Sequence, residues 1–166
     1  GWQVHAGGRT TVLSSENFLH PWATDPGLIA RRLFDVAPHA HILIVLREQV
    51  SLLTSFYRWH GGYGQYLFLN KYVDEPCEFP LSADQWMHYQ FMFESKNILG
   101  ILNYDDVIAD FEECFGAENI HVMTYETLVN DFDLYMKQLA NVLKIDAQQC
   151  AHHLKGVRAN SEGGLL

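Results

Sequence analysis

Residues 41–59 read HILIVLREQVSLLTSFYRW and contain both a strand pattern and a helix pattern. The first part, His41–Leu46, is a nearly continuous run of Ile, Leu and Val. A short apolar run of this kind is typical of a strand buried on both faces, as in a parallel sheet. Arg47 follows the run directly. Because open α/β sheets bind ligands at the carboxyl ends of their strands, Arg47 is a candidate ligand-binding residue.

The residues after Arg47 predict a helix that begins at Glu48 or Ser51 and ends near His60, before two glycines. At about 100° per residue, the apolar side chains share one helix face, and the other face carries polar side chains: Ser51, Thr54, Ser55 and Arg58. A strand-end arginine and a row of hydroxyls facing one crevice suit an anion, most naturally a phosphate. In the alternative interpretation, Arg47 pairs with a structural carboxylate and the serines are ordinary surface residues.

The N-terminal part of the chain predicts a strand and a helix. Thr10–Ser14 is rich in β-branched residues and predicts a short strand. Glu16 lies just past it, where a carboxylate would reach the ligand-binding edge. Asp25 and Pro26 predict a helix start, with Asp as the N-cap and Pro in the first helical position. Together with His41–Leu46, these elements predict a βαβ unit with parallel strands and a right-handed crossover.

The C-terminal half predicts three more helices and one more strand. Ser82 and Gln85 have the spacing of a capping box, and Gly116 has the position of a helix C-cap. The predicted elements are a helix over Ser82–Asn97, a helix over Tyr104–Phe115, a strand over Ile120–Tyr125, and an amphipathic helix from Asn130 or Asp131 to Leu143.

These elements predict a single α/β domain over residues 1–166, with a parallel central sheet flanked by helices. The chain begins in the middle of this pattern, so we expect the domain to be incomplete at its N-terminus. The segment Gly61–Leu81 carries several glycines and aromatic residues and predicts a long loop. Such a loop is either a lid or acceptor-binding segment, or a surface excursion pinned by its aromatic side chains.

Composition and charge restrict the possible partners. The net charge of −9 argues against a nucleic-acid partner, which needs clustered Lys and Arg. The three cysteines, Cys77, Cys114 and Cys150, form no metal or redox motif, and the acidic residues of 105–113 lack the spacing of a calcium loop. We therefore expect no metal.

No apolar run reaches membrane-spanning length, and free cysteines without a signal peptide favour the cytoplasm. The oligomeric state is left open.

Two segments resemble the sulfotransferase family. In the first, Leu46-Arg47 ends a strand and is followed by a helix that carries Ser55-Phe56-Tyr57. In the second, a strand is followed by Tyr125-Glu126-Thr127-Leu128 and then by a helix ending in Leu139-Ala140-Asn141-Val142-Leu143. The two segments in this order are much more specific than either alone, and the resemblance covers roughly residues 10–160.

The resemblance implies a P-loop-NTPase-like sulfotransferase fold and a donor, 3′-phosphoadenosine 5′-phosphosulfate (PAPS), that leaves as adenosine 3′,5′-bisphosphate (PAP). The acceptor would be a hydroxyl or amine of a carbohydrate, a lipid or a small metabolite. Arg47 and Ser55 would bind the 3′-phosphate. A late loop containing Lys155, Gly156 and Arg158 would close over the nucleotide.

The resemblance also implies a general base and no metal. The family uses a Glu or a His at a strand end, so Glu16 is the first candidate, His20 the second and His5 the third. The loop that binds the 5′-phosphosulfate in the family is not found in this chain, and Gln49 and Ser51 stand where the family often has proline and an acidic residue. The alternative function is therefore a non-catalytic sulfotransferase-like binding or interaction module. A kinase is a weaker alternative, because neither metal-holding carboxylates nor a phosphate loop is visible.

Overall fold

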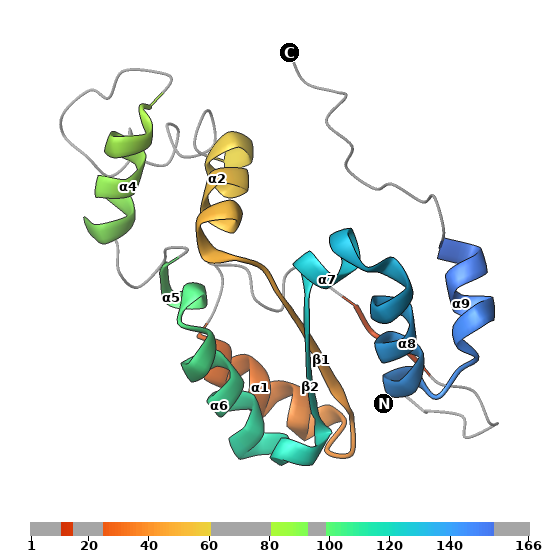
Figure 1. Cartoon of the computed structure of the whole chain (residues 1–166). Helices are drawn as coiled ribbons and strands as arrows, with labels where there is room; N and C mark the ends of the chain where they lie inside the picture. Colours follow the sequence, from red (N-terminus) through yellow and green to blue (C-terminus); the bar gives the residue numbers. More distant parts are fainter. Residues whose placement is uncertain (1–10, 15–24, 61–80, 93–98, 155–166) are drawn as a thin grey trace.

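The structure is a computed structural model that describes residues 11–14, 25–60, 81–92 and 99–154. Within these ranges, helices surround a two-stranded sheet (Figure 1). In chain order the elements are α1 (Pro26–Val36), β1 (Ile42–Leu46), α2 (Gln49–His60), α4 (Ala83–Met92), α5 (Leu99–Leu102), α6 (Tyr104–Phe115), a 3₁₀ turn (Ala117–Asn119), β2 (Ile120–Thr124), α7 (Tyr125–Asn130), α8 (Phe132–Leu143) and α9 (Ala147–Leu154).

The two strands pair in parallel. Ile42 lies opposite Ile120, and the register continues without a break to Leu46 opposite Thr124. Both strands therefore end at the same edge of the sheet. The expectation of an α/β chain with a parallel sheet flanked by helices is confirmed at this level of detail.

Helices cover both faces of the sheet, as a parallel pair requires. On one face, Ile44 of β1 packs against α1 and α6 in a buried cluster with these members: Ile29, Ala30, Val107, Phe111 and Phe115. On the other face, Met123 of β2 and Leu43 of β1 pack against Tyr135 and Met136 of α8. Figure 1 shows α1 and α6 together on one side of the strands and α7 to α9 on the other. The period-2 alternation along β1 thus divides its apolar residues between two cores.

A third apolar cluster joins α2 to α4 beyond the carboxyl end of β1 (Figure 1). Leu81 and Trp86 are its buried members, and Phe56 of α2 packs against them. The Tyr57 hydroxyl donates a 2.6 Å hydrogen bond to the Leu81 carbonyl oxygen, and its ring lies 5.6 Å from that of Trp86. These contacts hold α2 in place beside the edge where both strands end.

The helix caps form at the positions that the sequence predicts. The Asp25 carboxylate accepts a 2.8 Å hydrogen bond from the Gly27 amide. The capping box is reciprocal, because the Ser82 amide donates to the Gln85 side chain at 2.9 Å and the Gln85 amide donates to the Ser82 hydroxyl at 3.2 Å. Asp131, rather than Asn130, caps α8.

Two predictions about strands are wrong. Thr11–Ser14 is not a strand, and Val12 and Leu13 are 62% and 75% exposed. The parallel partner of His41–Leu46 is therefore Ile120–Thr124 and not the segment at 10–14. The β-propensity of Thr11–Ser14 has no effect without a neighbour that buries its side chains. Tyr125 is likewise not the last residue of a strand: the Thr124 hydroxyl accepts from the Thr127 amide and starts α7 instead.

None of the helices within the described ranges is long and apolar enough to cross a membrane.

Gly116 is the position where the backbone most clearly requires glycine. It ends α6 with φ +82° and ψ 141°, and a Cβ atom there would lie 2.8 Å from the Glu118 carboxylate oxygens. Such backbone strain costs of the order of 1–3 kcal/mol in a non-glycine residue. We expect Gly116→Ala to lower the free energy of unfolding by about that amount in urea denaturation.

The matched control is Gly100→Ala in α5. A Cβ atom at Gly100 would meet nothing within 4 Å. Alanine is the better helix former by about 0.5–1 kcal/mol, so Gly100→Ala should be neutral or stabilising. Equal effects of the two substitutions would show that the conformation of Gly116 is not a constraint.

Candidate functional site

The residues that follow β1 and β2 meet at the carboxyl edge of the sheet. Leu46 lies opposite Thr124, so the parallel register brings Arg47 and Glu48 beside Tyr125 and Glu126. This edge is where open parallel sheets bind ligands. The two segments that carry the family resemblance are therefore neighbours in space.

The Arg47 guanidinium is held by a hydroxyl and an aromatic ring. Its Nε and Nη2 atoms donate hydrogen bonds of 3.0 and 2.8 Å to the Ser51 hydroxyl oxygen. Its central carbon lies 4.7 Å from the centre of the Tyr125 ring, which is the geometry of a cation–π contact. Ser51 reaches Arg47 because it lies in the first turn of α2, four residues along the chain. Within the described ranges these hydrogen bonds go to a hydroxyl, while the Glu126 carboxylate of the alternative interpretation interacts with Arg47 through its charge, which helps to lower the pKa of Glu126.

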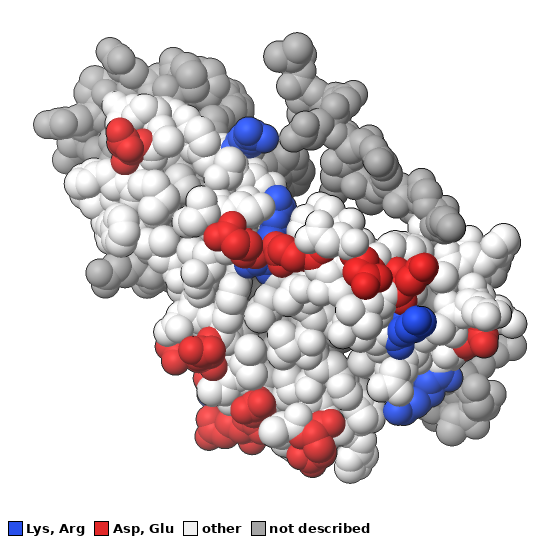
Figure 2. Space-filling view, viewed as in Figure 1, with Lys and Arg blue, Asp and Glu red and all other residues white. Residues whose placement is uncertain are grey.

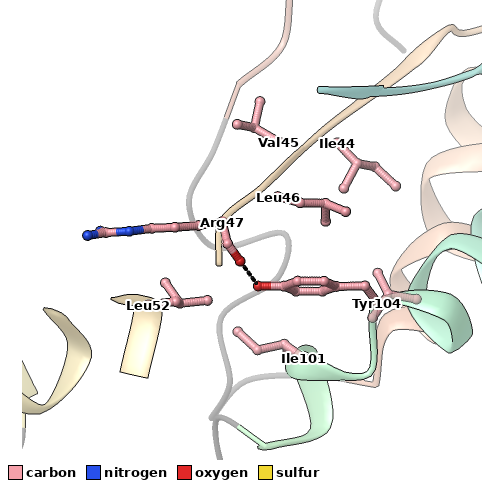
Figure 3. Close-up of a pocket in the computed structure, with 8 residues that line it drawn as sticks. Ile44, Val45, Leu46, Arg47, Leu52, Ile101 and Tyr104 are labelled. Atoms are coloured by element: carbon pink, nitrogen blue, oxygen red, sulfur yellow. Dashed lines mark hydrogen bonds between the residues drawn. The ribbon is translucent and has the colours of Figure 1, made fainter. Parts of the chain in front are cut away.

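The peptide group that joins Arg47 to Glu48 is fixed by two further hydrogen bonds. The Tyr104 hydroxyl donates to the Arg47 carbonyl oxygen at 2.6 Å (Figure 3). Burial raises the pKa of Tyr104, so this donor keeps its proton at neutral pH. The Glu48 amide donates to the Glu126 carboxylate at 2.9 Å, and this bond is the main cause that lowers the pKa of Glu126. Glu126 therefore links the ends of β1 and β2 as a carboxylate.

Glu48 uses its side chain to start α2. Its carboxylate oxygens accept hydrogen bonds from the Val50 amide at 2.9 Å and from the Ser51 amide at 2.6 Å. Two free amides at the start of the helix are thereby satisfied from within the chain. A ligand at this edge would be bound by the Arg47 and Ser51 side chains rather than by these backbone amides.

The structure changes the ranking of the two candidate serines. Ser55, the predicted phosphate ligand, is half-buried and lies one turn beyond Ser51 on α2, whereas Ser51 contacts the guanidinium. The sequence places Ser51 in the polar row of the helix and gives no reason to prefer it over Ser55. The signal that could have identified it is a serine four residues after a strand-end arginine. Tyr125 was missed as an Arg47 contact, although its position just past a parallel strand was visible.

The other candidate site residues lie outside the described part of the chain. They are the proposed bases Glu16 and His20, with His5 as the third candidate, and the late-loop residues Lys155, Gly156 and Arg158. Most of the predicted lid or acceptor segment, residues 61–80, lies outside it as well.

A small apolar hollow of about 150 Å³ lies beside the backbone of Arg47. Its walls come from β1, α2, α5 and α6, and include Leu46, Leu52 and Ile101. Figure 3 shows the Arg47 guanidinium extending away from this hollow, whereas Tyr104 reaches the Arg47 carbonyl from the hollow side. The apolar hollow and the cationic group are thus separate features of the same strand end.

The charges around the site are mixed. Figure 2 shows a few basic side chains beside α2, bordered by acidic side chains, on a chain whose net charge is −9. The described residues include no cluster of three or more His, Cys, Asp or Glu side chains that could hold a metal ion. The Arg47 guanidinium and the Ser51 hydroxyl are groups that can donate hydrogen bonds to an anion.

Comparison of the chain with family models, with curated proteins and with solved structures finds no match.

The hydrogen bond from Tyr104 to the Arg47 carbonyl can be tested separately from ligand binding. Tyr104→Phe removes a donor and leaves that carbonyl with one partner fewer, so we expect a loss of about 0.5–1.5 kcal/mol in the free energy of unfolding. Tyr125→Phe is the control, because it keeps the ring beneath the guanidinium. Chemical denaturation would contradict the assignment if the two substitutions had equal effects.

Proposed function

We propose that this chain is a PAPS-dependent sulfotransferase domain with a P-loop-NTPase-like fold. The observation that carries the proposal is the Arg47 guanidinium, held by Ser51 and Tyr125 at the carboxyl edge of a parallel strand pair. In this proposal, Arg47 and Ser51 bind the 3′-phosphate of the donor. Ser55, one turn further along α2, is the next ligand in the same row.

The hydrogen-bond directions support an anion in this place. The Ser51 oxygen accepts two bonds from the guanidinium, so its own O–H proton is left to point at a ligand. Arg47 has five N–H donors, and among the described residues Ser51 takes two of them, which leaves donors for phosphate oxygens. A planar guanidinium fork matches the geometry of a phosphate better than an ammonium group does. Arginine and serine therefore supply donors to one point.

The positions of the two resembling segments also support the proposal. Leu46-Arg47 and Tyr125-Glu126 are far apart in the sequence, yet they lie at adjacent strand ends. They are joined by the hydrogen bond between the Glu48 amide and the Glu126 carboxylate and by the contact between Arg47 and Tyr125. A binding site for PAPS to which both segments contribute is a physical reason for both to occur in one chain.

The proposed reaction transfers the sulfuryl group in line, as in phosphoryl transfer. The acceptor oxygen or nitrogen attacks sulfur, the bond from sulfur to the 5′-phosphate oxygen breaks, and PAP leaves. Glu16, or His20 in second place, takes the acceptor proton. Lys155, Gly156 and Arg158 close over the nucleotide. The acceptor is a hydroxyl or amine of a carbohydrate, a lipid or a small metabolite, and no metal takes part.

If PAPS is the sulfuryl donor, nucleotide binding should depend on both the 3′-phosphate of the nucleotide and Arg47. We expect calorimetric titration to show tighter binding of PAP than of AMP or ATP. Arg47→Ala should weaken PAP binding by about 1.5–3 kcal/mol, the range of a charge-assisted hydrogen bond. Ser51→Ala should lose about 1.5 kcal/mol, the lower end of the same range, because only the phosphate end of its hydrogen bond is charged.

Arg31→Ala is the charge-matched control, because Arg31 is an exposed residue of α1 and lies away from this edge. Unchanged PAP affinity in Arg47→Ala, or equal affinity for PAP and AMP in the unmodified protein, would overturn the donor assignment. A preference for ATP would favour a kinase. PAP binding without any turnover of PAPS would favour the non-catalytic binding module.

The general base is tested by kinetics. Glu16→Gln should leave the PAP affinity unchanged and lower the turnover of PAPS by about 100-fold or more, the usual contribution of a general base. The measurement is the release of PAP with a hydroxyl acceptor. A variant with unchanged turnover would transfer the role to His20, which His20→Asn would then test.

A further inference from the structure

A pair of histidines lies at the opposite, amino edge of the sheet from Arg47. His41 directly precedes β1, and His121 is the second residue of β2, paired with Leu43. Their rings are stacked, with centroids 5.2 Å apart and planes inclined by 27°. Nδ1 of His41 lies 3.0 Å from Nε2 of His121. The parallel register thus places two ring nitrogens side by side at the start of both strands.

This nitrogen–nitrogen distance suits two ligands of one metal ion. Imidazole nitrogens bind transition metals at about 2.0–2.1 Å, so two ligands at a right angle are about 2.9 Å apart and two at the tetrahedral angle about 3.3 Å apart. The observed 3.0 Å lies between these values. We propose that His41 and His121 together bind one divalent transition-metal ion, with solvent molecules as the remaining ligands.

The protonation state of the pair permits this. Without a metal, one of the two facing nitrogens carries the shared proton. A shift of that proton to the other nitrogen of the same ring would give both facing nitrogens a lone pair for one ion, with no proton lost.

Solvent access favours metal binding at the histidine pair, whereas the charges of the chain have opposing effects on it. His41 is exposed and His121 is half-buried, which leaves room for solvent ligands. The net charge of −9 attracts cations, whereas the Lys144 ammonium near His121 repels them.

Nitrogen and water ligands near a right angle suit copper(II) best among the divalent first-row metals, with zinc(II) weaker. A bound ion would tie the amino ends of β1 and β2 together and stabilise the folded chain by mass action.

The test is a titration of the full chain with copper(II), followed by calorimetry and by electron paramagnetic resonance. We expect one site whose hyperfine pattern reports two nitrogen ligands. His41→Ala and His121→Ala should each lower the affinity at least tenfold and leave one nitrogen in the spectrum. Lys144→Asn should raise the affinity, because it removes the opposing charge and asparagine tolerates the left-handed backbone at that position.

The chain has nine histidines, so a background of weak binding needs a control. His88→Ala, on α4, should leave the strong site intact. Because His41 is exposed and precedes the strand, His41→Ala should fold even where His121→Ala does not. A thermal unfolding curve of His41→Ala is the check that this variant is folded. A one-nitrogen spectrum in the unmodified protein, or unchanged affinity in His41→Ala, would overturn the proposal. PAP binding is measured separately and does not depend on this result.

Discussion

The parallel pairing of β1 with β2 is the interaction on which the rest of the structure depends. A parallel pair cannot be closed by a tight turn, so the chain between Leu46 and Ile120 must leave the sheet and return to its opposite end. The residues that do so include α2, α4, α5 and α6. The pair must also be covered on both faces. The α1–α6 cluster and the α8 cluster follow from this requirement, with Ile44 and Leu43 as adjacent residues that point to different cores.

The same register determines what meets at the two ends of the sheet. Because Leu46 lies opposite Thr124, the next residue on each strand brings Arg47 to Tyr125. A shift of one residue would move the side chains of β2 to the opposite face and destroy this contact. The bonds from Tyr104 to the Arg47 carbonyl and from the Glu48 amide to Glu126 then fix both polar atoms of the peptide group that follows Arg47. The position of the charge is therefore set by main-chain pairing more than by the Arg47 side chain itself.

Local rules were sufficient where the signal was local. The helix over Tyr104–Phe115 has the predicted bounds because Gly116 ends it with a backbone conformation that favours glycine. The capping box at Ser82 is also local, since both partners lie within one turn. Thr11–Ser14 fails because a strand exists only through its partner, and four residues of β-propensity do not specify one. Pairing between residues 78 positions apart could be expected only as a type of sheet and not as a specific register.

The candidate site, too, could be predicted only in part from the sequence. The sequence identifies Arg47 because strand ends bind ligands, and it identifies a row of hydroxyls because helical periodicity aligns Ser51 with Ser55. It does not choose between them, because both share one helix face and the choice depends on the direction in which α2 leaves β1. That direction is fixed by distant contacts, such as the bond from the Tyr57 hydroxyl to Leu81. Ser51 lies in the first turn, where the side chain of Arg47 ends, so short-range geometry favours it whenever α2 begins within two residues of the strand-end arginine. The spacing from Arg47 to Ser51 is therefore the more specific local mark of the site, and Ser55 depends on the ligand extending a further turn along the helix.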